Sequence, residues 1–373
     1  MKFNIQSKLL LSHLNAVSKV ISSKNAYAIL DNFLMEVVGD RLIITGTDME
    51  TRLTTNVEVQ NADGNGKFAV DVKRMLSLLK ELPDTAMTFD VNLETLEVVI
   101  TYLKGQFNIV AFNGDDYPQK AQGSDNVQEF SLSAKNVVAG IQHTLFAAGT
   151  DDMHPQFMGV YWDIKPDMIV YVASDTHKLV RFKQMNVAPN FERSFILPTK
   201  PAAILSQILD KNSDAEVKIT IDDNSAVFET PDYALSCRFV NGRYPNYNNV
   251  IPENNPYQAV ADRQTLLNAL RRVSVFASVG GLIKLQVKQG ELILNSQDLE
   301  HATSAEEKLQ CEYDGVEMTI GFKNSDVIEV LNNIAGENVV LKLLDPVRAG
   351  VFLPAEQQEG EELLILQMPM SIM

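Results

Sequence analysis

Residues 7–20 read SKLLLSHLNAVSKV, and the apolar pattern of this stretch returns twice more along the chain. Leu10, Leu11, Leu14 and Val17 have the spacing of one apolar helix face. The same four positions recur after 127 residues, and again after a further 129, as Val137, Val138, Ile141 and Thr144 and then as Leu266, Leu267, Leu270 and Val273. The stretch therefore predicts one helix that is repeated three times.

Single residues outside this helix keep nearly the same period. Asp48 in GTD is followed after 127 residues by Asp175 in ASD, and after 123 more by Asp298 in SQD. Pro118, Pro245 and Pro369 follow one another at 127 and 124 residues. Self-similarity at a fixed period indicates tandem structural repeats. We therefore predict three similar domains, 1–123, 124–252 and 253–373, each of a size that buries its own core.

Each repeat combines helices with strands in the same order. An alternating run comes first, as Phe3 and Ile5 show, and Ser7 is the expected N-cap of the first helix. Hairpins follow at 33–45, 159–174 and 283–296, and a second helix begins near Lys73, Lys200 and Lys323. The predicted fold class is α+β, with two helices per repeat burying one apolar stripe against antiparallel sheets.

The charge of the chain is unevenly distributed. The formal net charge is −16, which by itself argues against nucleic acid as a partner. The six helical windows nevertheless hold thirteen basic and five acidic residues, and residues 1–30 contain four lysines and no acid. A basic surface of this kind suits phosphates if the helices share one side of the fold.

The sequence gives little support to catalysis or metal binding. Asp48, Asp175 and Asp298 fall one in each repeat, after a strand, where Asp commonly caps a turn. Acid-base chemistry requires two carboxylates that converge on one site. The five histidines have no metal-ligand spacing, and no phosphate-binding or nucleophile motif is present. We expect no metal, no cofactor and no enzyme activity.

The expected compartment is the cytoplasm. Cys237 and Cys311 are two lone thiols, as in proteins of a reducing compartment. The longest apolar runs are interrupted by polar residues, so we expect no membrane span and no membrane partner. Asn4, Gln6 and Lys8 break any signal-peptide core at the N-terminus.

Several local segments, taken together, resemble the bacterial sliding clamp family, the beta subunit of DNA polymerase III. They run along the whole chain: MKF at residue 1, TDMET at 47, ASDTHKL at 173, NGRYPNY at 241 and MPM at 368. The resemblance implies three domains, each with two helices on the inner face and antiparallel sheets outside. It also implies a ring-shaped, head-to-tail homodimer that encircles duplex DNA without sequence preference.

The resemblance further implies a hydrophobic peptide groove between the second and third domains. Its matching positions are Ser174, Thr176, His177, Leu179, Pro245, Val250, Met368, Pro369 and Met370, with Phe157 as a further wall. Thr176 stands where the family usually has Gly, and the chain ends in Ser-Ile-Met where a basic residue and a final Leu are common. The implied partners are the alpha subunit of DNA polymerase III, the clamp loader, and other polymerases and repair proteins that carry clamp-binding peptides.

Two further sets of residues complete the expected sites. The resemblance implies interface contacts near Phe107, Val275 and Phe276, and a DNA contact at Lys24. The helical windows add further DNA-binding candidates by their charge: Lys8, Lys19, Lys73, Arg74, Lys135, Lys200, Arg271 and Arg272.

Two other classes of function stay open from sequence alone. One is a carboxylate-dependent enzyme, for example one acting on glycans, in which Asp48, Asp175 or Asp298 is catalytic. The other is a repeat scaffold that binds only protein, in which the helix lysines are ordinary solvated residues. A dimer of about 83 kDa, twice the 41.5 kDa of one chain, separates the clamp from both.

Overall fold

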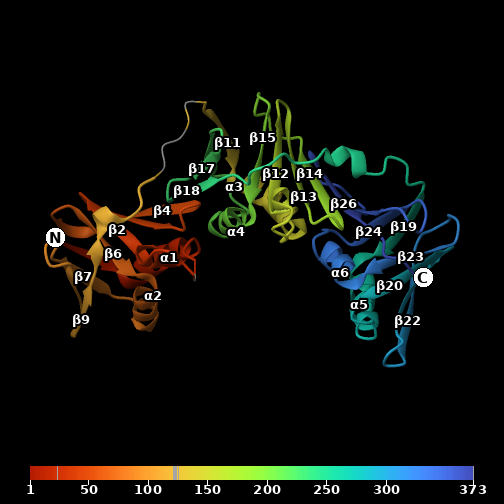
Figure 1. Ribbon diagram of the computed structural model, residues 1–373, viewed down its shortest axis with the longest axis horizontal. Coiled ribbons are helices and arrows are strands. Elements are labelled where there is room, and N and C mark those ends of the chain that lie inside the picture. The colour runs from red at the N-terminus through yellow and green to blue at the C-terminus, as the bar shows by residue number, and fades with distance from the viewer. Residues whose placement is uncertain (23, 121–123, 125, 373) are drawn as a thin grey trace. The chain divides into compact units, whose positions relative to one another are not determined.

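Each repeat contributes two helices to the fold. The computed structural model describes residues 1–22, 24–120, 124 and 126–372. The helices in this part of the chain are α1 (Ser7–Ser18), α2 (Val72–Glu81), α3 (Ala134–Gln142), α4 (Thr199–Ile208), α5 (Arg263–Ser274) and α6 (Asn324–Asn332). Helix α1 lies beside α2, and α5 lies beside α6 (Figure 1).

The repeated apolar face is buried, as the sequence predicts. Leu10, Leu14 and Val17 of α1 are fully buried, and the matching residues of α5 are also in the core. A completely buried leucine contributes about 1.5–3 kcal/mol relative to an exposed one, so this stripe fixes which side of each helix faces the sheets.

The predicted N-cap at Ser7 is wrong. Ser7 is the first residue of α1 and is fully buried, and Gln6 occupies the N-cap position without a capping side chain. The Ser7 hydroxyl instead donates to the Pro83 carbonyl at 2.7 Å and accepts from the Thr85 amide at 3.1 Å. These two long-range hydrogen bonds satisfy the hydroxyl better than a local cap would.

The chain divides into two compact units. The first comprises Met1–Val138 and Lys200–Phe239, and the second comprises Ala139–Thr199 and Val240–Met373. The three-domain division with boundaries after residues 123 and 252 stays a prediction, and residue 123 lies outside the described residues.

The first unit contains two antiparallel sheets. One has the order β5 (Gln60–Asp63), β1 (Lys2–Gln6), β7 (Ala86–Val91), β8 (Glu97–Tyr102) and β9 (Gly105–Val110). The other has the order β10 (Phe112–Asn113), β6 (Gly66–Asp71), β2 (Asn32–Val38), β3 (Arg41–Thr47), β4 (Thr51–Glu58), β18 (Tyr233–Arg238), β17 (Ser225–Glu229), β16 (Glu216–Ile221) and β11 (Gln128–Ser133). The pair β4–β18 therefore joins the first repeat to the second.

The second unit is built in the same way. Its larger sheet has the order β15 (Arg193–Pro198), β12 (Gly159–Lys165), β13 (Met168–Ser174), β14 (Lys178–Gln184), β26 (Glu361–Gln367), β25 (Gly350–Pro354), β24 (Asn338–Leu343) and β19 (Tyr257–Asp262). Its smaller sheet has the order β22 (Thr303–Gln310), β21 (Glu291–Asp298), β20 (Leu282–Lys288) and β23 (Met318–Lys323). The pair β14–β26 joins the second repeat to the third.

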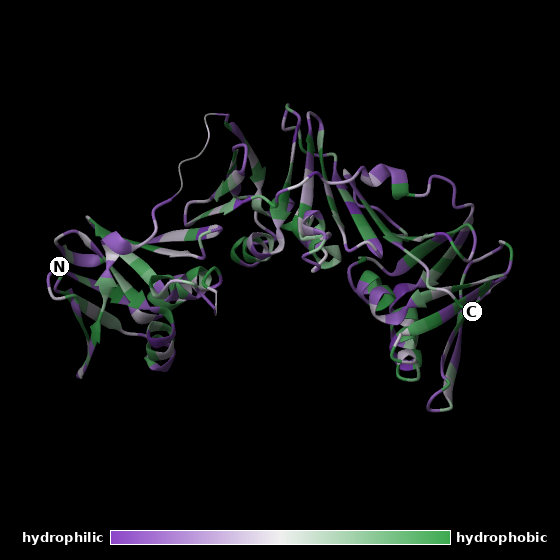
Figure 2. Ribbon diagram, viewed as in Figure 1, coloured by the Kyte–Doolittle hydropathy of each residue, from purple (hydrophilic) through white to green (hydrophobic). Residues whose placement is uncertain are grey.

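The strands alternate between the core and the surface, as antiparallel sheets with one covered face do. In β20, Ile283, Leu285 and Val287 are buried and their neighbours are not. Figure 2 shows hydrophobic and hydrophilic residues interspersed along the strands. The antiparallel pairs β2–β3, β12–β13 and β20–β21 confirm the three predicted hairpins.

Candidate functional site

The three repeated aspartates cap three copies of one turn. In each copy the carboxylate oxygen Oδ1 accepts hydrogen bonds from the backbone amides two and three residues further on. The distances are 3.1 and 2.7 Å for Asp48, 2.9 and 2.8 Å for Asp175, and 2.9 and 3.1 Å for Asp298. The turns lead directly into β4, β14 and β22. Each aspartate thus serves its own repeat, which agrees with turn capping and not with a shared catalytic centre.

The second oxygen of each carboxylate binds a different cationic partner. Asp48 Oδ2 accepts from Lys200 Nζ, Asp175 Oδ2 from Lys178 Nζ at 2.7 Å, and Asp298 Oδ2 lies 2.9 Å from His301 Nδ1. Lys178 is buried, whereas His301 is exposed. In all three repeats the aspartate accepts the same two backbone hydrogen bonds, but the cationic partner of its second oxygen differs.

Lys178 is held from two sides. Its Nζ lies 2.7 Å from Asp175 Oδ2 and 3.1 Å from Glu329 Oε2 of α6. Burial of Lys178 lowers its pKa, but the hydrogen bonds and charges of Asp175 and Glu329 outweigh this effect and raise the pKa above its ordinary value. Burial likewise opposes ionisation of Asp175, and the hydrogen bonds from Lys178 still hold the pKa of Asp175 below its ordinary value. Lys178 was not predicted as a site residue, although it stands three residues after Asp175.

Each of these turns holds one residue in the left-handed backbone conformation that favours glycine, and in two of the turns this residue directly follows the aspartate. Thr176 has φ of +76°, and Met49 at the matching position of the first repeat has φ of +80°. In the third turn the residue with positive φ is Ala302, at +52°, and Leu299 directly after Asp298 is not among the described residues with positive φ. A side chain in this region is strained, and a β-branched one more so. The resemblance places Gly at position 176, and this φ gives a physical reason for that preference.

The predicted groove residues of β14 lie over an aromatic cluster. Leu179 belongs to a buried cluster with Val172, Tyr244, Tyr247 and Leu366, and Phe157 packs against the same cluster. The rings of Tyr161 and Tyr244 stack at 4.5 Å between centroids, and Phe157 meets Tyr244 edge-on at 5.7 Å.

The tyrosines of this cluster were not predicted. Tyr244 and Tyr247 flank the predicted Pro245, and this spacing of aromatic residues around a proline was the available signal. Tyr247 donates from its hydroxyl to Asp163 Oδ2 at 2.8 Å. Pro245 and Val250 are exposed beside the buried tyrosines, while Ser174 is buried and donates from Oγ to the Lys178 carbonyl.

The C-terminal segment is attached at two points. The Met368 amide donates to the His177 carbonyl at 2.8 Å, so Met368 and the turn of Thr176 and His177 are neighbours. The Met370 amide donates to the Gly321 carbonyl of β23, also at 2.8 Å. A Cβ at Gly321 would lie 2.5 Å from Ile372 Cγ2, so the segment needs glycine there to approach the strand. Met368 keeps 43% of its surface exposed, and Met373 lies outside the described residues.

Acids elsewhere in the chain compensate some of the predicted DNA-binding bases. Lys135 pairs with Asp214, Lys200 with Asp48, and Arg272 forms two hydrogen bonds with Glu307. None of these acids lies in the helical windows, so a count of charges within the windows overstated the basic excess. The remaining candidates have no acidic partner within 4 Å in the described part of the chain, and all are exposed: Lys8, Lys19, Lys24, Lys73, Arg74 and Arg271.

The predicted interface residues lie near two free sheet edges. Strand β9 ends one sheet of the first unit, and its Phe107 is half-buried and stacked on Tyr102 at 5.6 Å. Strand β22 ends the smaller sheet of the second unit. Val275 and Phe276 follow α5 in that unit and are 78% and 41% exposed.

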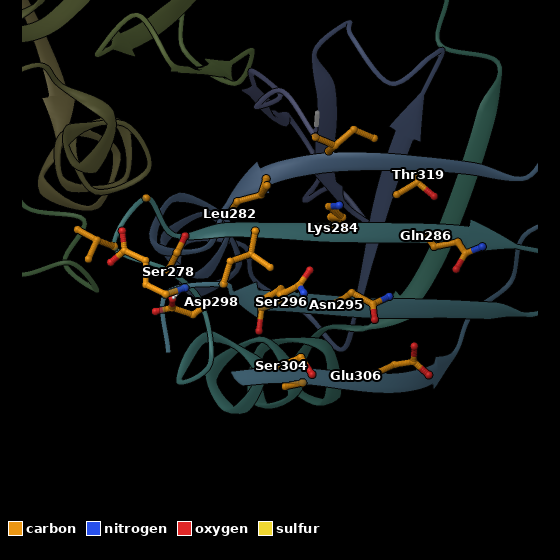
Figure 3. Close-up of a pocket in the computed structure, with 17 residues that line it drawn as sticks. Ser278, Leu282, Lys284, Gln286, Asn295, Ser296, Asp298, Ser304, Glu306 and Thr319 are labelled. Atoms are coloured by element: carbon orange, nitrogen blue, oxygen red, sulfur yellow. Dashed lines mark hydrogen bonds between the residues drawn. The ribbon is translucent and has the colours of Figure 1, made fainter. Parts of the chain in front are cut away.

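A separate hollow of about 910 Å³ lies on the smaller sheet of the second unit. Lys284, Asn295 and Glu306 stand on three adjacent strands within it (Figure 3). Its rim includes Val279 and Leu299, both strongly exposed, and it contains none of the predicted groove residues.

Two features of the described residues concern metal binding and membrane insertion. No group of three or more His, Cys, Asp or Glu side chains is arranged to hold a metal ion within this part of the chain. In the same residues, no helix is both long enough and apolar enough to cross a membrane.

Three family models match the chain in sequence order. The N-terminal domain of the DNA polymerase III beta subunit matches residues 1–121, the central domain matches residues 131–246, and the C-terminal domain matches residues 248–371. Together the matches extend from the first residue almost to the last.

Individual relatives match over the same length. The beta sliding clamp of Pseudomonas aeruginosa is 27% identical over 362 residues, which cover 96% of this chain and 98% of the relative. The beta sliding clamp of Escherichia coli strain K12 is 26% identical over 374 residues, with 100% of both chains covered. A crystal structure of a Pseudomonas aeruginosa sliding clamp bound to griselimycin is similar with a TM-score of 0.93 at 26% identity, again over 100% of both chains.

Proposed function

The chain belongs to the DNA polymerase III beta subunit family, and on this basis we propose that two copies close head to tail into a ring around duplex DNA. The family gives the general function, that of a sliding clamp in DNA replication. The ring, its DNA contacts and its partners are argued below from the residues of this chain.

One observation carries the proposal. The two junctions within the chain, where a strand of one repeat pairs with a strand of the next, have the same strand order. The strands for a third junction of this kind are present but are not paired with each other. At each internal junction, the last strand of a three-strand run pairs antiparallel with the final strand of the next repeat, as β4 does with β18 and β14 with β26. By the same order, β22 of the third repeat requires the strand of a first repeat that matches β18 and β26, which is the last in the run β1-β7-β8-β9. That strand is β9, a free edge.

A second copy supplies the missing partner for both edges. If β22 of one chain pairs with β9 of the other, the joined sheet has the strand order of the internal junctions. A head-to-tail pair of two chains then makes two such junctions and leaves neither edge open. Exposed edge strands invite this kind of pairing because their amide and carbonyl groups lack partners.

Apolar side chains beside the free edges support the same interface. Val275 and Phe276 are exposed at the end of α5, and Val279 and Leu299 are exposed on the rim of the nearby hollow. Phe107 and Tyr102 form a stacked pair on the sheet that ends with β9. Exposed apolar residues gathered in this way indicate a surface that another protein covers.

The ring holds DNA by enclosure and not by affinity. Phosphate affinity grows with the number of charges that a protein neutralises and falls with salt. A chain of net charge −16 with scattered bases that lack an acidic partner is suited to weak, sequence-independent contacts. Lys24 and the other exposed bases without an acidic partner are the proposed contacts, and weak contacts permit sliding.

The predicted groove residues are the proposed docking site for partner peptides. Leu179, Met368 and the aromatic cluster supply apolar contacts, and methionine suits a surface that adapts to several partners. The proposed partners are the DNA polymerase III alpha subunit, the clamp loader, and other polymerases and repair proteins with clamp-binding peptides. A tethered polymerase gains a high effective concentration at its template.

Three finer points belong to the same proposal. The subunit is non-catalytic, because its repeated aspartates are engaged in separate turns. It acts in the cytoplasm, where the bacterial chromosome is replicated. Its three domains end near residues 123, 252 and 373, so that each carries one copy of the aspartate turn.

Calorimetric titration with griselimycin tests the docking site, because a relative of this chain binds this compound. We expect griselimycin to bind the wild-type chain. The double substitution Met368→Ala with Met370→Ala should lower the affinity for griselimycin about tenfold or more, because truncation of a residue that anchors an interface costs over about 1 kcal/mol of binding free energy. The same variant keeps the dimeric mass of about 83 kDa, twice that of the 41.5 kDa chain. Unchanged griselimycin affinity would refute the assignment of the docking site.

A further inference from the structure

Two polar contacts connect helix α6 to the strands that carry the proposed groove walls. Lys178 of β14 binds Glu329 of α6 at 3.1 Å. Gln367 of β26 lies with its Nε2 3.5 Å from Asp326 Oδ2 of α6. Lys178 and Gln367 are opposite one another in the β14–β26 pair, and both are buried.

Each of these buried residues directly precedes a proposed groove wall. Leu179 follows Lys178 in β14, and Met368 follows Gln367 at the end of β26. The Met368 amide and the Gln367 side chain both donate to the carbonyl of His177, at 2.8 and 3.4 Å. Any movement of Lys178 or Gln367 therefore moves a wall residue with it.

Asp326 and Glu329 of α6 each link a buried residue to the surface of the protein, so a change of charge at the surface can reach the buried residues. Asp326 is buried, and its Oδ1 lies 3.8 Å from Nζ of Lys323, an exposed lysine at the start of the helix. Glu329 is half-exposed while its partner Lys178 is buried. If Glu329 moved away, the buried Lys178 would keep only Asp175, and the loss of one of its two charged partners is disfavoured. Lys178 is therefore drawn toward Glu329 when that carboxylate moves.

We propose that Lys178 and Gln367 are positioning residues that couple helix α6 to the partner-peptide groove, so that the contacts of α6 set the affinity for peptide. The proposal rests on the proposed function, because it takes Leu179 and Met368 as groove walls. Coupling between two sites is reciprocal, so peptide in the groove also biases the position of α6.

The experiment compares griselimycin affinity, measured by calorimetric titration, among single variants of the full chain. Glu329→Gln removes the charge of the half-exposed partner with little risk to folding. Lys178→Met removes the buried charge, and Lys178→Arg restores a cation at the same place. We expect about fivefold weaker binding for Glu329→Gln and Lys178→Met, near the lower end of typical coupling. Lys178→Arg recovers most of the affinity.

A double-mutant cycle and a matched control distinguish coupling from general loosening. Lys178→Met with Glu329→Gln together should weaken binding no more than Lys178→Met alone, because Lys178→Met already removes the contact that Glu329→Gln removes. Lys183 and Glu362 form the control pair, since they are also opposite one another on β14 and β26, with 3.1 Å between their charged atoms. Lys183→Met should leave the affinity unchanged.

The outcomes separate the two hypotheses. If Met368→Ala fails to weaken griselimycin binding, the groove itself is wrongly assigned. If Met368→Ala weakens binding but Glu329→Gln and Lys178→Met do not, the groove stands and the coupling is overturned. Equal weakening by Lys183→Met and Glu329→Gln also overturns it, because the effect then comes from the sheet as a whole.

Discussion

Strands β14 and β22 of the second unit are preceded by the same aspartate turn but differ in every contact beyond it. At the head of β14, Asp175 binds the buried Lys178, and β14 pairs with β26 along its whole length. At the head of β22, Asp298 binds the exposed His301, and the outer edge of β22 has no strand partner among the described residues. One strand belongs to a completed junction and the other to an open one.

The difference separates features that stabilise the turn in every repeat from features that occur only at the uncovered strand. The aspartate and its two backbone hydrogen bonds are kept in all three repeats, so they stabilise the turn itself. The buried lysine occurs where the strand is covered within the chain. Exposed Val275, Phe276 and Leu299 occur near the strand that is not covered.

Charge placed at the open junction should produce the largest effect. We expect Val275→Asp with Phe276→Asp to abolish the dimer, because two carboxylates would have to be buried without partners. Sedimentation equilibrium would then give the 41.5 kDa of a single chain instead of twice that mass. Val347→Asp is the control, since Val347 is equally exposed at 78% but lies between β24 and β25. A dimer that survives the double substitution removes these residues from the interface.

Replacing Asp175 by Asn should lower the free energy of unfolding more than replacing Asp298 by Asn. Asn keeps the oxygen that accepts from the backbone but removes the negative charge. Asp175→Asn leaves Lys178 with Glu329 alone, and we expect a loss of about 2 kcal/mol, which is less than for a fully buried pair. Asp298→Asn should have a much smaller effect, because His301 is exposed to water. Urea unfolding of both variants measures the difference, and equal losses would contradict it.

Substitution by glycine directly after the aspartate should stabilise the turn before β14 and destabilise the turn before β22. Thr176→Gly relieves a β-branched residue at φ of +76°, and we expect a gain of about 1 kcal/mol after the greater flexibility of the unfolded chain is included. Leu299→Gly relieves no such strain and should lower stability. Thermal unfolding of the two variants at neutral pH tests this contrast, which fails if Thr176→Gly is the less stable of the two.

The smallest expected effect is the dependence of the stabilisation by Asp175 on pH. The pKa of Asp175 is held below its ordinary value of 3.8, so its stabilising contribution is fully present above pH 3.8 and is lost as the pH falls through the lower folded value. The difference in melting temperature between the wild type and Asp175→Asn should therefore be constant from pH 7 to pH 5 and shrink below pH 3.8. A difference that stays constant down to pH 2 would show that the charge of Asp175 is not its cause.

Local patterns predicted most of the fold. The alternation in 283–287 and the helical spacing of Leu10, Leu14 and Val17 each depend on residues close in sequence, and both elements formed where expected. The turn role of Asp48, Asp175 and Asp298 was also predictable, because its hydrogen bonds reach only three residues ahead.

The features that sequence missed depend on contacts between distant residues. Ser7 meets Pro83, Lys200 meets Asp48, and Arg272 meets Glu307, and no local pattern reports such partners. Lys178 left one visible signal: it shares a strand face with the buried Val180 and Phe182, which a solvated lysine would not do. The contact between Gly321 and Met370 joins strand β23 to a segment that is distant from it in the chain.

Retention on DNA of different topology tests whether the protein encircles its duplex. A bacterial clamp loader places the labelled protein on a nicked circular plasmid, and gel filtration measures how much stays bound before and after one restriction enzyme opens the circle. A ring should remain on the circle at moderate salt and leave through the free ends once the DNA is linear. Equal retention on circular and linear DNA would mean that surface contacts, and not a closed ring, hold the protein to the duplex.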